Sequence, residues 1–75
     1  MKIEFTSSAI AEMTHDKDAN ELTVIFHYAK NVKYIYSNVS YQRLTAHLHS
    51  NSIGSYFQKI RSNPDEFPFR KEVTN

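Results

Sequence analysis

Apolar and polar positions alternate along the middle of the chain. In the segment ELTVIFHYAKNVKYIY, every second residue from Leu22 to Tyr28 is aliphatic or aromatic, and the same holds from Val32 to Tyr36. A period of two, rich in β-branched and aromatic side chains, is typical of strands. The pattern therefore predicts two antiparallel strands, residues 22–28 and 32–36, joined as a hairpin.

Residues 29–31 separate these two strands. They lack the Asn-Gly pair that favours a two-residue turn, and Asn31 tolerates a positive φ, so we expect a three-residue loop. This loop gives one apolar face and the pairs Tyr28 with Val32, Phe26 with Tyr34 and Val24 with Tyr36. The alternative, a two-residue loop, would place the tyrosines on the face of Ile25 and His27.

The residues before the hairpin are less regular. Residues 1–6, which include Ile3 and Phe5, are expected to form an extended lead-in. Residues 9–14 predict a short strand anchored by Ile10 and Met13. The polar segment 15–20 then reads as a turn, because it lacks the glycine and terminal glutamate of a calcium-binding loop.

After residue 36 the apolar period changes to that of helices. Ser40 is a suitable N-cap for a helix with an apolar stripe, and Ser52 is suitable for a second one. The stripe residues are Tyr41, Leu44 and Leu48 in the first helix and Ile53, Phe57 and Ile60 in the second. Pro64 ends the second helix, residues 67–69 are expected to lie over the edge of the core, and residues 70–75 to form a disordered tail.

Strands followed by helices indicate an α+β fold. We expect the order β-β-β-α-α, with a three-stranded antiparallel sheet and two short helices packed on one face. Phe26 should then be buried against Leu44 and Phe57.

The composition sets limits on size and chemistry. A chain of 75 residues forms one domain with a small core. It contains no cysteine, which excludes disulfides and thiolate metal sites. No apolar run has the length of a membrane span, so we expect a cytoplasmic protein that does not engage a membrane.

The charges are divided unevenly along the chain. Residues 1–21 hold five acidic and two basic side chains, whereas residues 22–75 hold seven basic and three acidic ones. Such asymmetry can mark a surface that binds nucleic acid or another phosphate-bearing ligand. A solvated surface with scattered charges is the alternative.

Two surfaces are candidates for binding. Sheet tyrosines can stack on bases and cations can hold phosphates, although the tyrosines would also suit a core beneath the helices. The candidates for nucleic-acid contact are Lys33, Tyr34, Tyr36, Arg43, Lys59 and Arg61, and the pair Arg70-Lys71 is a further candidate for holding phosphates. The candidates for a protein interface, on the sheet face opposite the helices, are Ile25, His27 and Ile35.

The sequence holds no motif for catalysis or metal binding. His47 and His49 are two residues apart, so on a helix they point in different directions. A nucleophile elbow, a Gly-rich phosphate loop and a His-Glu-x-x-His motif are all missing. We expect no enzyme activity, no metal and no cofactor.

Four short motifs occur in a familiar order. They are Ser7-Ser8-x-Ile10, Leu22-x-Val24-x-Phe26, Tyr34-x-Tyr36 followed by Val39, and Gly54-x-Tyr56-Phe57-x-x-Ile60-Arg61. In this order and spacing, residues 7–73 resemble the KTSC domain family, which occurs at the C-terminus of some lysyl-tRNA synthetases and as small bacterial proteins. The chain has Lys30-Asn31 where the family usually has a glycine turn, and Ser40 where it often has proline.

The resemblance implies RNA binding, because of the synthetase context. We therefore expect a small, non-catalytic binding module whose first candidate partner is RNA. The alternative is a regulatory or inhibitory module that docks on a protein or on its own copy. The strand of residues 32–36, exposed along its outer side, predicts a homodimer that Ile35→Lys would break.

Overall fold

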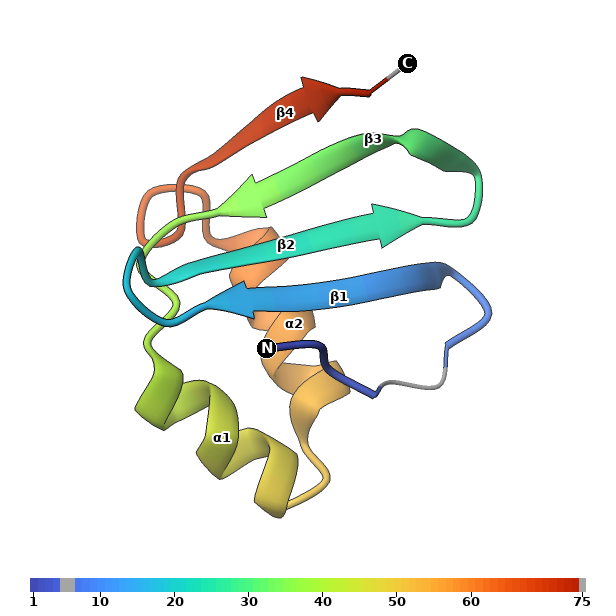
Figure 1. Cartoon of the computed structure of the whole chain (residues 1–75). Coiled ribbons are helices and arrows are strands. Elements are labelled where there is room, and N and C mark those ends of the chain that lie inside the picture. The colour runs from blue at the N-terminus through green and yellow to red at the C-terminus, as the bar shows by residue number, and fades with distance from the viewer. Residues whose placement is uncertain (5–6, 75) are drawn as a thin grey trace.

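The computed structural model describes residues 1–4 and 7–74, and Phe5, Thr6 and Asn75 lie outside the described residues. The elements follow in the order β1 (Ile10–Asp16), β2 (Glu21–Phe26), β3 (Ala29–Tyr36), α1 (Tyr41–His49), α2 (Ile53–Ser62) and β4 (Phe69–Val73). The strands form an antiparallel sheet in the order β1-β2-β3-β4, and both helices lie on one face of it (Figure 1). The α+β class is confirmed, with four strands in the described chain in place of three.

The β2–β3 hairpin keeps the predicted apolar face but not the predicted loop. The turn is His27-Tyr28, and residues 29–31 already belong to β3. Leu22 pairs with Tyr36, and Val24 pairs with Tyr34. The predicted partners were therefore shifted by two residues, a shift that leaves every side chain on its own face.

An irregularity in β3 explains why a two-residue turn still gives this face. Phe26 pairs with Ala29 while Val24 pairs with Tyr34, so residues 30–33 lie opposite Ile25 alone. Four residues of β3 thus face one residue of β2, an excess of three. An odd excess moves the following side chains to the other face of the sheet. It therefore returns Tyr34 and Tyr36 to the face of Val24, which a two-residue turn alone would not do.

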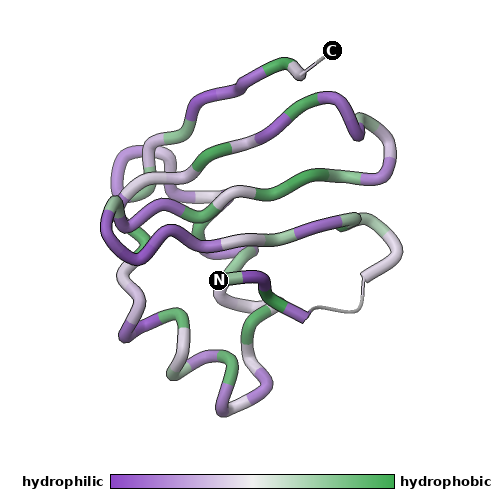
Figure 2. The backbone as a smooth tube through the Cα atoms, viewed as in Figure 1, coloured by the Kyte–Doolittle hydropathy of each residue, from purple (hydrophilic) through white to green (hydrophobic). Residues whose placement is uncertain are grey.

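The core lies between the helices and the face of the sheet that carries Leu22, Val24 and Phe26. A bulge between Ile10 and Glu12 in β1 turns both Ile10 and Met13 toward it. The remaining buried members are Ile3, Tyr36, Val39, Leu44, Ile53, Tyr56, Phe57, Ile60 and Phe67. Phe26, Leu44 and Phe57 share this core, as predicted, while the β1–β2 turn is hydrophilic (Figure 2).

The chain before β2 is more ordered than the pattern indicated. Ile3 is buried, and its amide donates to the carbonyl of Met13 at 2.8 Å, so this part of the lead-in pairs with β1. The strand β1 also extends two residues beyond the predicted strand. Its His15 is buried, and Nε2 donates to the carbonyl of Val39 at 2.6 Å.

The two serines predicted as N-caps behave differently. The Ser40 hydroxyl accepts from the amide of Arg43 at 3.2 Å and caps α1 as predicted. Ser52 makes no such bond with α2, because its hydroxyl is 2.7 Å from Nδ1 of His47.

Asparagine forms the left-handed corners of the chain. Asn20, Asn38 and Asn51 have φ values of 55°, 63° and 58°. They precede β2, α1 and α2, where the chain reverses or enters a helix. Asn reaches this region more readily than other residues that carry a Cβ.

The predicted disordered tail is wrong for residues 70–73, which belong to β4. Ser37 N donates to Pro68 O and Thr74 N donates to Asn31 O. In an antiparallel ladder every second residue turns its backbone groups toward the partner strand, so Arg70 and Glu72, which lie between Pro68 and Thr74, also face β3. The amides of the intervening residues, Lys71 and Val73 among them, therefore face outward along the edge of the sheet.

Candidate nucleic-acid interface

The helices leave the β4 side of their own sheet face uncovered (Figure 1). Phe69 and Lys71 of β4 pair with Tyr36 and Tyr34 of β3, and paired residues share a face. We call this surface the aromatic strip and define it by Tyr28, Tyr34, Arg61, Phe69 and Lys71.

The rings of the strip form a continuous series. Tyr28 stacks on Phe26 with centroids 5.3 Å apart, and Phe26 meets Tyr34 edge to face at 5.3 Å. Phe69 lies 6.2 Å from Tyr34 and 5.6 Å from Tyr36. The outer rings are the accessible ones, since Tyr28 is 72% and Phe69 48% exposed.

Two cations lie over these rings. Lys71 Nζ is 5.4 Å from the centroid of Tyr34, and the Arg61 guanidinium carbon is 5.2 Å from that of Phe26. Each exposed contact of this kind contributes about 0.5–1 kcal/mol. The strip thus combines accessible aromatic surface with positive charge.

Burial raises the pKa of Tyr36 above 10.0, although the nearby charge of Arg61 opposes the shift. The hydroxyl is protonated at neutral pH. Because Tyr36 is buried, its ring belongs to the core rather than to the exposed part of the strip.

The six residues predicted for nucleic-acid contact do not form one surface. Tyr34 and Arg61 belong to the strip, whereas Tyr36 is buried in the core. Arg43 and Lys59 line a separate pocket between the helices. Lys33 lies on the opposite sheet face, paired with Glu72.

Tyr28 and Phe69 were not among the binding candidates predicted from the sequence, and Lys71 was named only together with Arg70 as a phosphate candidate. Tyr28 was assigned to a covered strand but lies in the β2–β3 turn. Phe69 and Lys71 are two residues apart, a spacing that gives one face only if their segment is a strand. The weak signal was this Phe-x-Lys alternation.

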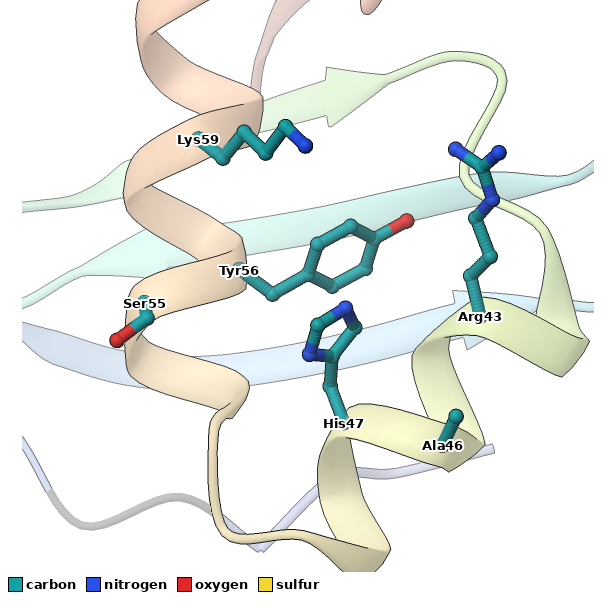
Figure 3. Close-up of a pocket in the computed structure, with 6 residues that line it drawn as sticks. All are labelled: Arg43, Ala46, His47, Ser55, Tyr56 and Lys59. Atoms are coloured by element: carbon teal, nitrogen blue, oxygen red, sulfur yellow. The ribbon is translucent and has the colours of Figure 1, made fainter.

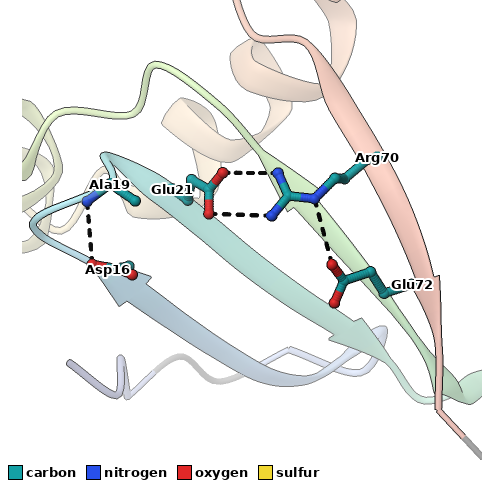
Figure 4. Close-up of polar contacts among 5 residues, drawn as sticks. All are labelled: Asp16, Ala19, Glu21, Arg70 and Glu72. Atoms are coloured by element: carbon teal, nitrogen blue, oxygen red, sulfur yellow. Dashed lines mark hydrogen bonds and ion pairs between the residues drawn. The ribbon is translucent and has the colours of Figure 1, made fainter.

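The residues predicted for a protein interface are only partly available. His27 is exposed, Ile25 is half-buried, and Ile35 is buried with 6% exposure. Arg70 pairs with Ile35 and extends across β3 to Glu21 on β2 (Figure 4). The Ile35 contact is therefore a wrong prediction, because its strand is flanked by β4 and Ile35→Lys would place a charge in a buried position.

The Arg70 side chain links β4 to β2 across β3. Its Nη1 lies 2.8 Å from Oε2 of Glu21, and its Nε lies 3.5 Å from Oε2 of Glu72 (Figure 4). The hydrogen bond between Arg70 and Glu21 lowers the pKa of Glu21 and raises that of Arg70.

We expect Arg70→Gln to raise the pKa of Glu21 toward its ordinary value of 4.5. Because folding lowers the pKa of Glu21, the ion pair stabilises the fold at pH values above the ordinary pKa. This stabilisation disappears as the pH falls through the lowered pKa. Carboxyl NMR titration measures the midpoint directly. Glu72→Gln is the control and should leave the midpoint low, whereas equal midpoints in wild type and Arg70→Gln would contradict the assignment.

A comparison with protein families matches the KTSC domain over residues 6–63. The chain belongs to the KTSC domain family. The part of the KTSC match that the structure describes runs from before β1 to just after α2. The strand β4, with its Phe69 and Lys71, lies beyond the matched residues.

Comparisons with curated proteins and with solved structures each gave no match. Within residues 1–4 and 7–74 of this KTSC chain, no three His, Asp or Glu side chains are grouped so that they could hold a metal ion. None of the helices in the same residues is long and apolar enough to cross a membrane.

Proposed function

We propose that this KTSC domain is a small, non-catalytic, cytoplasmic module that binds single-stranded RNA on the aromatic strip. The observation that carries the proposal is Lys71 lying over Tyr34, in a series of rings that ends in the exposed Tyr28 and Phe69. The expectation of RNA binding drawn from the family resemblance points to the same class of ligand.

The chemistry of the strip favours unpaired bases. A base that stacks on an aromatic side chain contributes about 1–3 kcal/mol, and a neighbouring cation holds the phosphate backbone. In double-stranded RNA the bases are stacked on one another and are read mainly through groove shape. Exposed rings such as Tyr28 and Phe69 therefore suit a single strand.

Fluorescence anisotropy with a labelled single-stranded RNA tests this proposal. We expect Phe69→Ala or Tyr28→Ala to weaken binding by about 5- to 150-fold, the loss of one stacked base. Lys71→Gln should weaken binding and reduce its salt dependence, because one phosphate contact is lost.

Lys33→Gln is the matched control, since Lys33 lies on the neighbouring strand but on the opposite face. It should leave RNA affinity unchanged. If the wild-type chain binds no single-stranded RNA at about 0.15 M salt, or if Lys33→Gln weakens binding as much as Lys71→Gln, the strip is not an RNA site.

The outer edge of β4 favours a second candidate function, docking on a protein or on a second copy of the chain. All five residues of β4 are exposed, and an edge strand offers backbone groups to another strand. We expect a homodimer of this kind to sediment as such at micromolar concentration. Val73→Pro should abolish it without unfolding the chain, because the Val73 amide faces outward, and a monomeric wild type would exclude it.

A further inference from the structure

A pocket of about 410 Å³ lies between α1 and α2, on the other flank of α2 from the aromatic strip. Its lining comes from both helices: Arg43, Ala46, His47, Ser55, Tyr56 and Lys59. Figure 3 shows Arg43, Tyr56 and Lys59 directed into the space between the helices, whereas the Ser55 hydroxyl points away from it.

The floor of the pocket is a fixed pair of rings. His47 and Tyr56 stack with centroids 4.1 Å apart and an interplanar angle of 15°. Nδ1 of His47 lies 2.7 Å from the Ser52 hydroxyl, which holds the orientation of the imidazole. The position of the Tyr56 ring is therefore set before any ligand arrives.

The Tyr56 hydroxyl is buried without a partner in the described chain. The residue is only 4% exposed, and its Oη makes no hydrogen bond. A buried hydroxyl left unpaired costs about 1–3 kcal/mol, so an unpaired one requires an explanation.

The pKa of Tyr56 is raised, chiefly by burial; Glu66 adds to the shift and Arg43 opposes it. At neutral pH the hydroxyl is thus an O–H donor. It is directed toward the pocket that Arg43 and Lys59 also enter (Figure 3).

The charge of the pocket is positive. Arg43 and Lys59 are exposed, and neither forms an ion pair with any other residue that the structure describes. No carboxylate belongs to the lining. A guanidinium, an ammonium and a phenolic O–H thus border one space, and the phenolic O–H has no hydrogen-bond acceptor among the described residues.

We propose that this pocket binds a phosphate group. A phosphate oxygen would accept the orphan Tyr56 hydroxyl, while Arg43 and Lys59 supply charge-assisted bonds to the other oxygens. The shared chemistry is a phosphate, whether free or attached to a nucleoside. The site is independent of RNA stacking on the aromatic strip, because it uses no residue of that strip.

Titration with inorganic phosphate at pH 7, followed by thermal unfolding and by NMR, tests the site against sodium chloride at equal ionic strength. We expect phosphate to raise the melting temperature and to shift the ring signals of His47 and Tyr56. Arg43→Gln and Lys59→Gln should each weaken phosphate binding about tenfold or more, the loss of one hydrogen bond to a charged group.

Tyr56→Phe is the decisive variant. Without phosphate it should be as stable as wild type or more stable, because the unpaired hydroxyl is removed while the ring stays. With phosphate its affinity should fall about tenfold. If the Tyr56 hydroxyl served only the fold, Tyr56→Phe would be less stable than wild type and would keep the full phosphate response.

Lys71→Gln on the aromatic strip is the matched control and should not alter the phosphate response. Comparing 5′-AMP with adenosine, and a 5′-phosphorylated oligonucleotide with its 5′-hydroxyl form, identifies the source: if the phosphate is attached to a nucleoside, only the phosphorylated members should shift the ring signals of His47 and Tyr56, whether or not the oligonucleotide also binds on the strip. Absence of any phosphate effect, or an effect that survives Tyr56→Phe, overturns the proposal. Neither result touches RNA binding on the strip.

Discussion

Phe26→Ala should lower the free energy of unfolding by about 3–5 kcal/mol, the usual cost of removing a buried phenyl ring. Phe26 is 2% exposed and contacts the rings of Tyr34 and Phe57, which come from β3 and α2. Losing it therefore weakens the packing of the sheet against α2. Because a domain of this size has few kilocalories of net stability, we expect much of the variant to be unfolded at 37 °C.

Tyr28→Ala is the matched control, because Tyr28 stacks on Phe26 but is mostly exposed. Denaturant unfolding followed by near-UV circular dichroism should show a small loss for Tyr28→Ala and a large one for Phe26→Ala. Similar midpoints for wild type and Phe26→Ala would mean that the core lies elsewhere.

Leu44→Ala should release α1 from the sheet. Leu44 is fully buried, and no other residue of α1 is buried to this extent. Truncation of a buried leucine costs about 2–5 kcal/mol. Since the other residues of α1 are at most partly buried, we expect the loss to appear first as local opening of Tyr41–His49.

Hydrogen exchange distinguishes local from global opening. In Leu44→Ala the amides of α1 should lose protection while those of β2 and β3 keep it, and phosphate binding should weaken because Arg43 and His47 lie on the same helix. Leu48→Ala is the control with the smaller expected effect, since Leu48 is only half-buried. Equal loss of protection in α1 and β2 would contradict a local role for Leu44.

The sequence pattern predicted the faces of the hairpin but not its register. Val24 and Tyr36 face the core as expected, because alternation reports the side of the sheet. It does not report the partner, since pairing Tyr36 with Leu22 or with Val24 buries the same face. The irregular segment of β3 has no glycine to reveal it.

The strand β4 was missed for a different reason. Every residue from Phe69 to Val73 is exposed, so beyond the weak Phe-x-Lys spacing the segment has no alternation of buried and solvated positions for a pattern to detect. Its position is determined by backbone pairing with β3, which depends on the register of a strand more than thirty residues earlier. Arg70 and Glu72 lie on the sheet face of Ile35. Without the pairing to β3, so polar a segment looks like a disordered tail.

The candidate site was accessible to sequence reasoning only in part. Tyr34 and Arg61 were identified by residue type, and both lie on the aromatic strip. The pocket was not foreseen as a unit, because Arg43 and Lys59 come from two helices whose relative placement no periodicity encodes. Likewise, the stack of His47 on Tyr56 depends on the short connection between those helices.

The left-handed corners at Asn20, Asn38 and Asn51 also affect the state of the chain before it folds. Glycine would adopt these angles with less strain, but it would also give the unfolded chain more conformations to lose. With one glycine in 75 residues, the unfolded ensemble is comparatively restricted, and ordering the backbone costs less entropy. Part of the stability of this small core thus originates in the disordered chain, where no contact in the folded structure reports it.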